Sequence, residues 1–234
     1  MKTFNTFFKS FHLVLFFVLF CNVHTVCPAQ KFGCVSGDCK NGVGVFSYPN
    51  GDKYEGEFSN NKLQGKGIFT FASGKWQGCR YNGEWANNMM NGNGIFEYAS
   101  GDRYEGQFIN NKLQGTGKYF YANGDSYYGE WSENQCNGIG TFIYAEGEYK
   151  GCTYQGEWKN SKMNGEGTFT CENGKTYKGH LKNNTKDGKG FLIMPDGSQY
   201  DGMFRQNKFH GQGCFTYASG KKVCGNWKDN KLMD

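Results

Sequence analysis

A 23-residue repeat is the feature of this chain that most restricts its fold. Most units begin with a tyrosine, followed at every second residue by Gly and then Phe or Trp, as in Tyr81-Asn-Gly-Glu-Trp85. A Gly-x-Gly pair occupies residues twelve and fourteen of eight successive units, two of which are 27 residues long. A repeat held in phase over this length indicates a protein in which each unit packs on its neighbours.

Each unit has the pattern of a β-hairpin. In Gly94-Ile-Phe96-Glu-Tyr98, ring-side and outward positions alternate, as in a strand with one buried face. Asn-rich loops such as residues 59–65 are expected to join the two strands, and turns such as residues 99–102 to join successive units. A single hairpin is marginally stable, so the units are expected to stack with their rings along one face. The glycines leave the space that a ring on the neighbouring strand needs.

These motifs resemble the MORN repeat (membrane occupation and recognition nexus), whose pattern is Tyr-x-Gly-x-Phe/Trp, a short loop, Gly-x-Gly and a closing aromatic residue. The resemblance covers residues 31–234 and implies an all-β fold: an elongated, single-layer antiparallel β-sheet solenoid of hairpins. It also implies a scaffold, tethering or dimerising role, sometimes near membranes. The repeat domain is expected at residues 30–234, with units starting near residues 31, 54, 81, 104, 127, 154, 177 and 200 and a half-unit at 223.

Residues 1–29 have the pattern of a signal peptide, which is expected to be helical. Lys2 and Lys9 precede an apolar run, Leu13–Cys21, that has about half the length of a membrane-spanning helix. We expect cleavage after Ala29 and a secreted, periplasmic or cell-surface location, with an uncleaved anchor as the alternative. Removal of this segment leaves eight cysteines, and an even number in an exported chain is compatible with disulfides.

Spacing along the repeats predicts how the cysteines pair. Two candidate disulfides join residues of one hairpin or of adjacent strands: Cys34 with Cys39, and Cys214 with Cys224. Cys79 and Cys152 are expected roughly 25–30 Å apart, too far for a disulfide. Cys136, in a hairpin loop, and Cys171, at a core position, are expected to be free thiols. No Cys-x-x-Cys motif occurs, so a zinc site is not expected.

The two long units share a four-residue insertion containing Trp76 or Tyr149. One interpretation is a pair of projecting fingers that grip a partner, and the other, which we favour, is a pair of longer hairpin arms. Because the insertions lie three units apart, residues 54–126 and 127–199 resemble a duplicated three-unit block.

Two further sets of residues are candidates for partner binding. Apolar side chains occupy outward positions of second strands, where a one-sided sheet should be polar, which suggests a dimer face, a covering segment or a partner surface: Ile68, Ile95, Phe120, Ile143, Phe191 and Ile193. Lysines recur at the ninth residue of several units, in the expected hairpin loops: Lys62, Lys112, Lys162, Lys208 and Lys231. Such a basic row could engage anionic lipid or polysaccharide, although ordinary solubilising lysines are the simpler interpretation.

Catalytic groups do not cluster in the sequence. After the leader only His180 and His210 remain, without a repeated nucleophile beside them. Four glutamates at the outward fourth position are expected to form a solvated row rather than an acid–base pair: Glu57, Glu84, Glu130 and Glu157. No helix follows the Gly-x-Gly pairs, so they are not phosphate loops, and a net charge of +5 does not suggest nucleic acid as a partner.

The sequence therefore predicts a non-catalytic, secreted scaffold without cofactor or metal, a rigid β-platform that binds a protein partner or dimerises. The alternative is a peripheral binder of anionic membrane lipid or envelope glycan that uses the lysine row together with Trp76 and Tyr149. An enzyme with a site between repeats is the third and least favoured interpretation.

Overall fold

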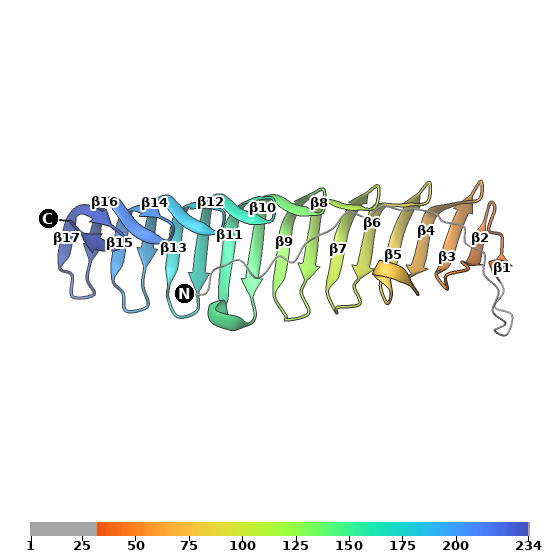
Figure 1. Ribbon diagram of the computed structural model, residues 1–234, viewed down its shortest axis with the longest axis horizontal. Coiled ribbons are helices and arrows are strands. Elements are labelled where there is room, and N and C mark those ends of the chain that lie inside the picture. Colours follow the sequence, from red (N-terminus) through yellow and green to blue (C-terminus); the bar gives the residue numbers. More distant parts are fainter. Residues whose placement is uncertain (1–31, 234) are drawn as a thin grey trace. The chain divides into compact units, whose positions relative to one another are not determined.

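A computed structural model of the chain describes residues 32–233, so the predicted signal peptide lies outside the described part. The described residues form two compact units, here called the N-terminal unit (residues 32–122) and the C-terminal unit (residues 123–233). Both consist of antiparallel strands joined by short connections (Figure 1). Within residues 32–233, no helix has the length and hydrophobicity needed to cross a membrane.

The N-terminal unit is a meandering antiparallel sheet in which each strand pairs with the next. Its strands are β1 (Gly33–Gly37), β2 (Val43–Ser47), β3 (Lys53–Ser59), β4 (Lys62–Thr70), β5 (Arg80–Ala86), β6 (Met89–Glu97), β7 (Arg103–Ile109) and β8 (Lys112–Phe120). A short 3-10 helix, η2 (Gly74–Trp76), lies in the longer connection between β4 and β5.

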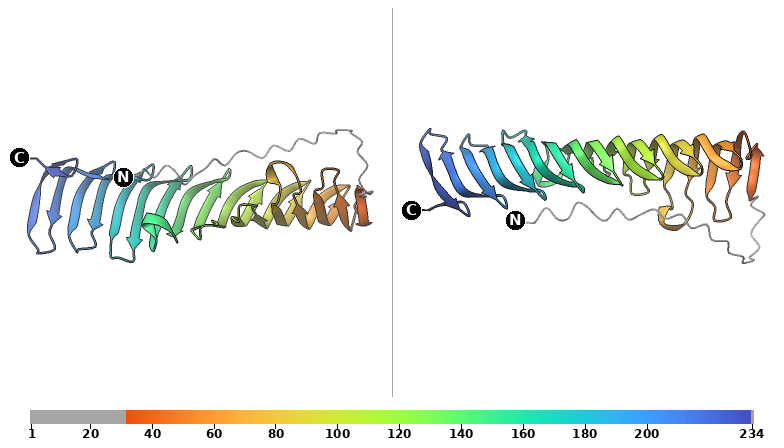
Figure 2. Two further views of the ribbon diagram at one scale, coloured as in Figure 1. Left: turned by 60° about the horizontal axis from the view of Figure 1, so that its bottom comes forward. Right: turned by 90° about the horizontal axis from the view of Figure 1, so that it is seen from above.

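The C-terminal unit repeats this arrangement, again with each strand paired to the next. Its strands are β9 (Ser126–Ser132), β10 (Gln135–Tyr144), β11 (Cys152–Lys159), β12 (Lys162–Cys171), β13 (Thr176–Lys182), β14 (Thr185–Ile193), β15 (Gln199–Arg205), β16 (Lys208–Thr216), β17 (Lys222–Lys228) and β18 (Lys231–Leu232). The helix η3 (Gly147–Tyr149) follows β10. The predicted all-β, single-layer antiparallel hairpin fold is thus confirmed, and Figure 2 shows each unit without a second layer of strands over its sheet.

From β3 onwards, the two strands of a hairpin are joined by two-residue turns, and not by the seven-residue loops that the sequence suggested. Asn60 and Asn61 both have positive φ, 51° and 60°, which is the backbone of a type I′ turn. Asparagine tolerates this left-handed conformation better than most residues. Residues 62–64, predicted as loop, therefore begin β4. In each unit these turns lie along one edge of the sheet, the tight-turn edge, and the other connections lie along the opposite edge, the loop edge (Figure 1).

Each tight turn is attached to the preceding hairpin by a pair of hydrogen bonds. The amide N–H of Leu63 donates to Oδ1 of Asn88 at 2.8 Å, and the Asn88 N–H donates to the Leu63 carbonyl at 3.1 Å. The same pair of bonds joins Met90 with Asn111, Met163 with Asn184, Lys186 with Asn207 and Phe209 with Asn230. Neighbouring turns are thereby held at the spacing of the hairpins.

A row of buried tyrosines forms the core of the sheet. Tyr54, Tyr81 and Tyr104 each have no exposed surface and occupy the same position of successive hairpins, as predicted. The Tyr81 hydroxyl donates to the Glu84 carbonyl at 3.0 Å, three residues further along. Its ring also meets the edge of Phe108 in the next hairpin, with centroids 5.0 Å apart. The face that carries these rings is called the ring face, and the opposite one the outer face.

Glycines pair with one another directly beneath the rings. Gly83 and Gly94 are register partners on β5 and β6. A Cβ atom on Gly94 would overlap the ring of Tyr81, with only 2.6 Å to Cζ. The glycines are therefore needed because the tyrosine of the same hairpin lies flat against their backbone.

Replacing Gly94 with alanine is expected to lower the free energy of unfolding by about 2–3 kcal/mol, because the methyl group displaces the Tyr81 ring. Gly225→Ala is the control: in the last hairpin this glycine occupies the position of Gly83, the register partner of Gly94, and its added methyl group would meet only the Leu232 side chain. Its cost should stay below about 1 kcal/mol. Urea unfolding of both variants measures the difference, and equal losses would contradict a steric role for the ring.

Candidate binding surfaces

The six apolar residues predicted on the outward side do lie on the outer face, but they do not form one continuous stripe. The six residues occupy two outward positions of their strands. At each position, polar residues on the neighbouring strands separate one apolar side chain from the next. Ile68 pairs with Glu55 on one side and Asn82 on the other. In the C-terminal unit, Phe191 lies between Lys178 and Asp201, and Ile193 lies between Thr176 and Gln199. Ile95 lies between Asn82 and Glu105, and Phe120 lies 5.7 Å below the guanidinium of Arg103.

The outer face of β9 and β10 carries the clearest apolar patch. Tyr128, Ile139 and Ile143 expose 54%, 55% and 49% of their surfaces. Tyr128 pairs with Thr141, which lies midway between the two isoleucines on β10. On the neighbouring strands, Glu157 of β11 pairs with Ile139, and β12 presents the uncharged residues Thr168 and Thr170. Only Ile143 of this patch was singled out from the sequence; Ile139 and Tyr128 follow the same outward alternation and were overlooked.

Trp76 and Tyr149 are not at the ends of projecting fingers. The insertions form η2 and η3, which turn back onto the ring face. Trp76 packs on Phe96 with ring centroids 5.7 Å apart, and Tyr149 packs on Phe169 at 5.6 Å. Both side chains are half-buried and extend the aromatic core. The favoured interpretation of longer hairpin arms is not what the structure shows either, because the insertions form the connections that contain η2 and η3.

The predicted row of lysines lies along the tight-turn edge, but not in loops. Each is the first residue of the second strand of its hairpin: Lys62 in β4, Lys112 in β8, Lys162 in β12, Lys208 in β16 and Lys231 in β18. The first residue of a strand next to a two-residue turn is held more rigidly than a residue of a seven-residue loop. Their side chains therefore start from fixed points of the sheet.

The four outward glutamates have a structural role that the sequence did not reveal. At each of these positions the strand pairing shifts, because a bulge leaves backbone N–H groups unpaired. The Glu57 carboxylate accepts the N–H of Lys66 at 2.9 Å, and Glu84 accepts that of Asn93 at 3.0 Å. Glu130 and Glu157 do the same for Ile139 and Glu166. These carboxylates therefore complete the fold and are neither a merely solvated row nor an acid–base pair.

Beside these bulges, the outer face of β4 to β7 has a shallow hollow of about 400 Å³, and its lining includes Lys66, Glu84, Asn93 and Ile95. The two histidines lie elsewhere. His180 Nδ1 lies 2.7 Å from the Asp187 carbonyl, and His210 Nδ1 is buried without a hydrogen-bond partner. Among residues 32–233, no group of three or more His, Cys, Asp or Glu side chains is arranged to hold a metal ion.

The described part of the chain contains three disulfides, two between neighbouring strands and one between β1 and the connection that follows it. They link Cys34 with Cys39, Cys152 with Cys171, and Cys214 with Cys224. The expectation that Cys171 is a free thiol is wrong, because β11 and β12 place it directly opposite Cys152. Cys79 and Cys136 are free and buried, and Cys136 belongs to β10 and not to a loop. Burial raises the pKa of the Cys136 thiol to about 12, so it is a poor nucleophile.

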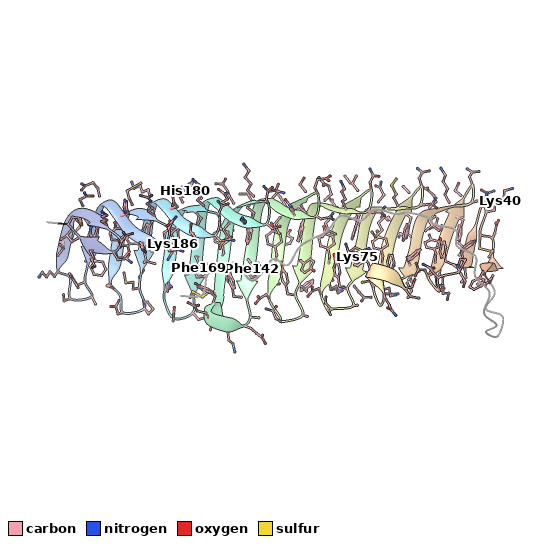
Figure 3. The ribbon with its side chains drawn as sticks, viewed as in Figure 1. Lys40, Lys75, Phe142, Phe169, His180 and Lys186 are labelled. Atoms are coloured by element: carbon pink, nitrogen blue, oxygen red, sulfur yellow. A yellow bond between two sulfur atoms is a disulfide. The ribbon has the colours of Figure 1, made fainter. Side chains whose placement is uncertain are left out.

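Lys186 interrupts the apolar core of the C-terminal unit. Other hairpins bury an apolar or sulfur-containing residue at this position: Leu63, Met90, Leu113, Cys136 and Met163. The Lys186 ammonium lies 5.1 Å from the ring centroid of Tyr177, in the body of the sheet (Figure 3). Burial, with a smaller contribution from Lys175, lowers the pKa of Lys186 to about 8. Sequence analysis missed this residue because its position was assigned to a loop.

Comparisons with known proteins agree with the repeat geometry. The family model described as MORN repeat matches eight segments: residues 33–53, 54–76, 81–103, 104–126, 127–149, 154–176, 177–199 and 200–222. A comparison with curated proteins finds no match.

Solved structures show weak similarity. The TCP10 domain of Danio rerio CPAP has a TM-score of 0.43 and 10% identity, covering 81% of this chain and 84% of that one. The Drosophila melanogaster SAS-4 (dCPAP) TCP domain, in complex with a proline-rich motif of Ana2 (dSTIL), has a TM-score of 0.40 and 13% identity, covering 88% and 99%. Catalytically inactive virginiamycin B lyase from Staphylococcus aureus has a TM-score of 0.20 and 10% identity, covering 86% and 75%.

The substitution Tyr98→Cys is expected to add a fourth disulfide. The register that pairs Arg80 with Glu97 places Cys79 opposite Tyr98, as Cys152 lies opposite Cys171 in the other long connection. Peptide mapping without reductant should recover a cross-link between Cys79 and the cysteine introduced at position 98. Tyr121→Cys is the control, because its hairpin has no second cysteine, and it should retain a free thiol at that position. A free thiol at position 98 would show that the two insertions are not structurally equivalent.

The stability of the protein is expected to rise as the pH increases from about 8 towards 10. The pKa of Lys186 is about 8 in the folded chain and near 10.5 when unfolded, so the unfolded state binds more protons in this range. Below pH 8, Lys186 is charged in the folded protein, and its burial lowers the free energy of unfolding by the full amount. As the pH rises above 8, the folded protein releases this proton and the destabilisation decreases. Buried tyrosines act in the opposite direction, but only above pH 10.

Lys186→Met is the control for this pH dependence. It should be more stable than the wild type at pH 7, because methionine suits the apolar row, and the difference should shrink by pH 10. Thermal unfolding of both proteins across this range measures the effect. If the stability difference between the two proteins does not change with pH, Lys186 is not the source of the pH dependence.

Proposed function

Because this chain belongs to the MORN-repeat family, we propose that it is a non-catalytic scaffold whose outer face binds a protein partner or a second copy of itself. The observation that carries this proposal is the exposed patch of Tyr128, Ile139 and Ile143. Large apolar side chains gathered on a solvent-exposed strand face are typical of interaction surfaces. The attached turns and the buried tyrosine row make the face beneath the patch rigid, so little conformational entropy is lost on binding.

We place the protein outside the reducing interior of the cell. The leader-like residues 1–29 support export, and the three disulfides of residues 32–233 suit an oxidising compartment. The intact mass of the protein isolated from its own host tests this placement, since cleavage after Ala29 removes the first 29 residues.

The double variant Ile139→Lys/Ile143→Lys is expected to abolish self-association or partner binding while the protein stays folded. Two lysines on the patch oppose the burial of apolar surface, yet both positions already face solvent. Thr168→Lys/Thr170→Lys is the matched control, with the same added charge on the same outer face two strands away.

Light scattering of the purified proteins reports self-association, and chemical cross-linking in the native host reports a partner. Association should survive in the threonine variant and disappear in the isoleucine variant. A wild-type protein that is strictly monomeric and cross-links to nothing would contradict the scaffold role.

A further inference from the structure

The tight-turn edge of the C-terminal unit carries cations on both sides of its turns. The residues just before and after the turn are register partners, and in three hairpins both are basic: Lys159 with Lys162, Arg205 with Lys208, and Lys228 with Lys231. Lys182 contributes one more cation in the hairpin between them, opposite Thr185. All seven cations are exposed. These four turns contain one carboxylate, Asp229, which lies 3.5 Å from Lys208.

The fold itself does not require like charges to face each other beside these turns. Two cations directly opposite each other on adjacent strands repel and destabilise a hairpin. The equivalent pairs in four other hairpins avoid this: Ser59 with Lys62, Ala86 with Met89, Ile109 with Lys112, and Ser132 with Gln135. A local arrangement that costs stability in three of four successive hairpins suggests a functional requirement at those positions.

The backbone holds these cations in a line of fixed spacing. Each turn is bonded to the hairpin before it, through Asn184, Asn207 and Asn230. Two strands per hairpin advance the row by roughly 9–10 Å, so four turns span roughly 30 Å. On the adjoining outer face, Glu157 and Glu166 carry negative charge. Lys178 and Lys189 add positive charge on the outer face of β13 and β14, so the regular row of cations, and not positive charge alone, distinguishes this edge.

We propose that this edge, formed by the turns at residues 159–162, 182–185, 205–208 and 228–231, binds a linear acidic polysaccharide. A narrow row of evenly spaced cations matches a chain with anionic groups along its length, and successive contacts on one chain reinforce one another. An acidic polysaccharide is also a polyanion that an exported, disulfide-bonded protein meets outside the cell. The site lies on the tight-turn edge, away from the protein-binding patch on the outer face, so the two proposals can fail separately.

Binding of size-fractionated polygalacturonate to the full mature chain tests the proposal, with the fully methyl-esterified polymer as the uncharged counterpart. The test variant changes Lys159, Lys162, Lys228 and Lys231 to glutamine. The matched control changes four lysines of the loop edge and the adjoining start of β17 in the same unit, so that the net charge is identical: Lys150, Lys175, Lys221 and Lys222.

The test variant is expected to bind polygalacturonate at least about tenfold more weakly, while the control variant stays within about twofold of the wild type. Affinity should rise with polymer length up to roughly 30 Å, the span of the four turns, and fall as salt screens the charges. Circular dichroism checks that both variants keep their strands.

Three results would overturn the proposal. The first is equal weakening in both variants, which would mean that net charge alone attracts the polymer. The second is equal binding of the methyl-esterified polymer. The third is binding to vesicles that contain phosphatidylserine but not to polygalacturonate, which would identify the edge as a membrane contact.

Discussion

The structure depends on the contact between a tyrosine ring and the backbone of two paired glycines. A single-layer sheet has no second layer to cover its core, so each hairpin must bury its own ring. The backbone bends around that ring, so that the hydroxyl of Tyr81 donates a hydrogen bond to the carbonyl of Glu84. The glycines allow the ring to lie flat on the strands. Phe108 of the following hairpin then closes one edge of the ring. Burial is complete even though the sheet is one layer thick, and this is why the repeat tolerates so little change at these positions.

Two of the three disulfides lie near the two ends of the described chain, and the third stands where a core ring is missing. The first described hairpin, which pairs β1 with β2, contains Cys34–Cys39, and Cys214–Cys224 joins β16 to β17, two of the last strands described. The third disulfide lies within the C-terminal unit, where Cys171 stands in place of the ring that Tyr98 or Tyr144 supplies in other hairpins. A cross-link restricts the unfolded chain and so offsets part of the missing ring packing. At this position a disulfide therefore takes the place of an aromatic ring in joining neighbouring strands.

The phase of the repeat was enough to predict the hairpins, the ring face and the glycine positions, because those depend on alternation along single strands. The connections were harder to predict. The segment at residues 59–65 is rich in polar residues and was expected to be a loop, yet only Asn60 and Asn61 leave the strands. This error hid Lys186, because the tenth residue of each unit was not recognised as part of the core. The role of Glu57 was missed for another reason: a bulge changes which backbone groups lack partners, and alternation of side chains carries no information on that.

The periodic and the variable positions of this chain carry different information. Tyrosines, paired glycines and turn asparagines repeat because every hairpin must solve the same packing problem. Apart from the turn asparagines and the bulge glutamates, the outer face and the tight-turn edge are free of that requirement, and there the hairpins differ from one another: Tyr128 and Ile139 occur on two adjacent strands, and paired cations only from β11 onwards. A ligand that recognised the repeat itself would need the same side chains in every unit. Since the exposed positions change along the chain while the buried ones do not, recognition must reside in particular hairpins, with the remaining ones holding them at fixed separations.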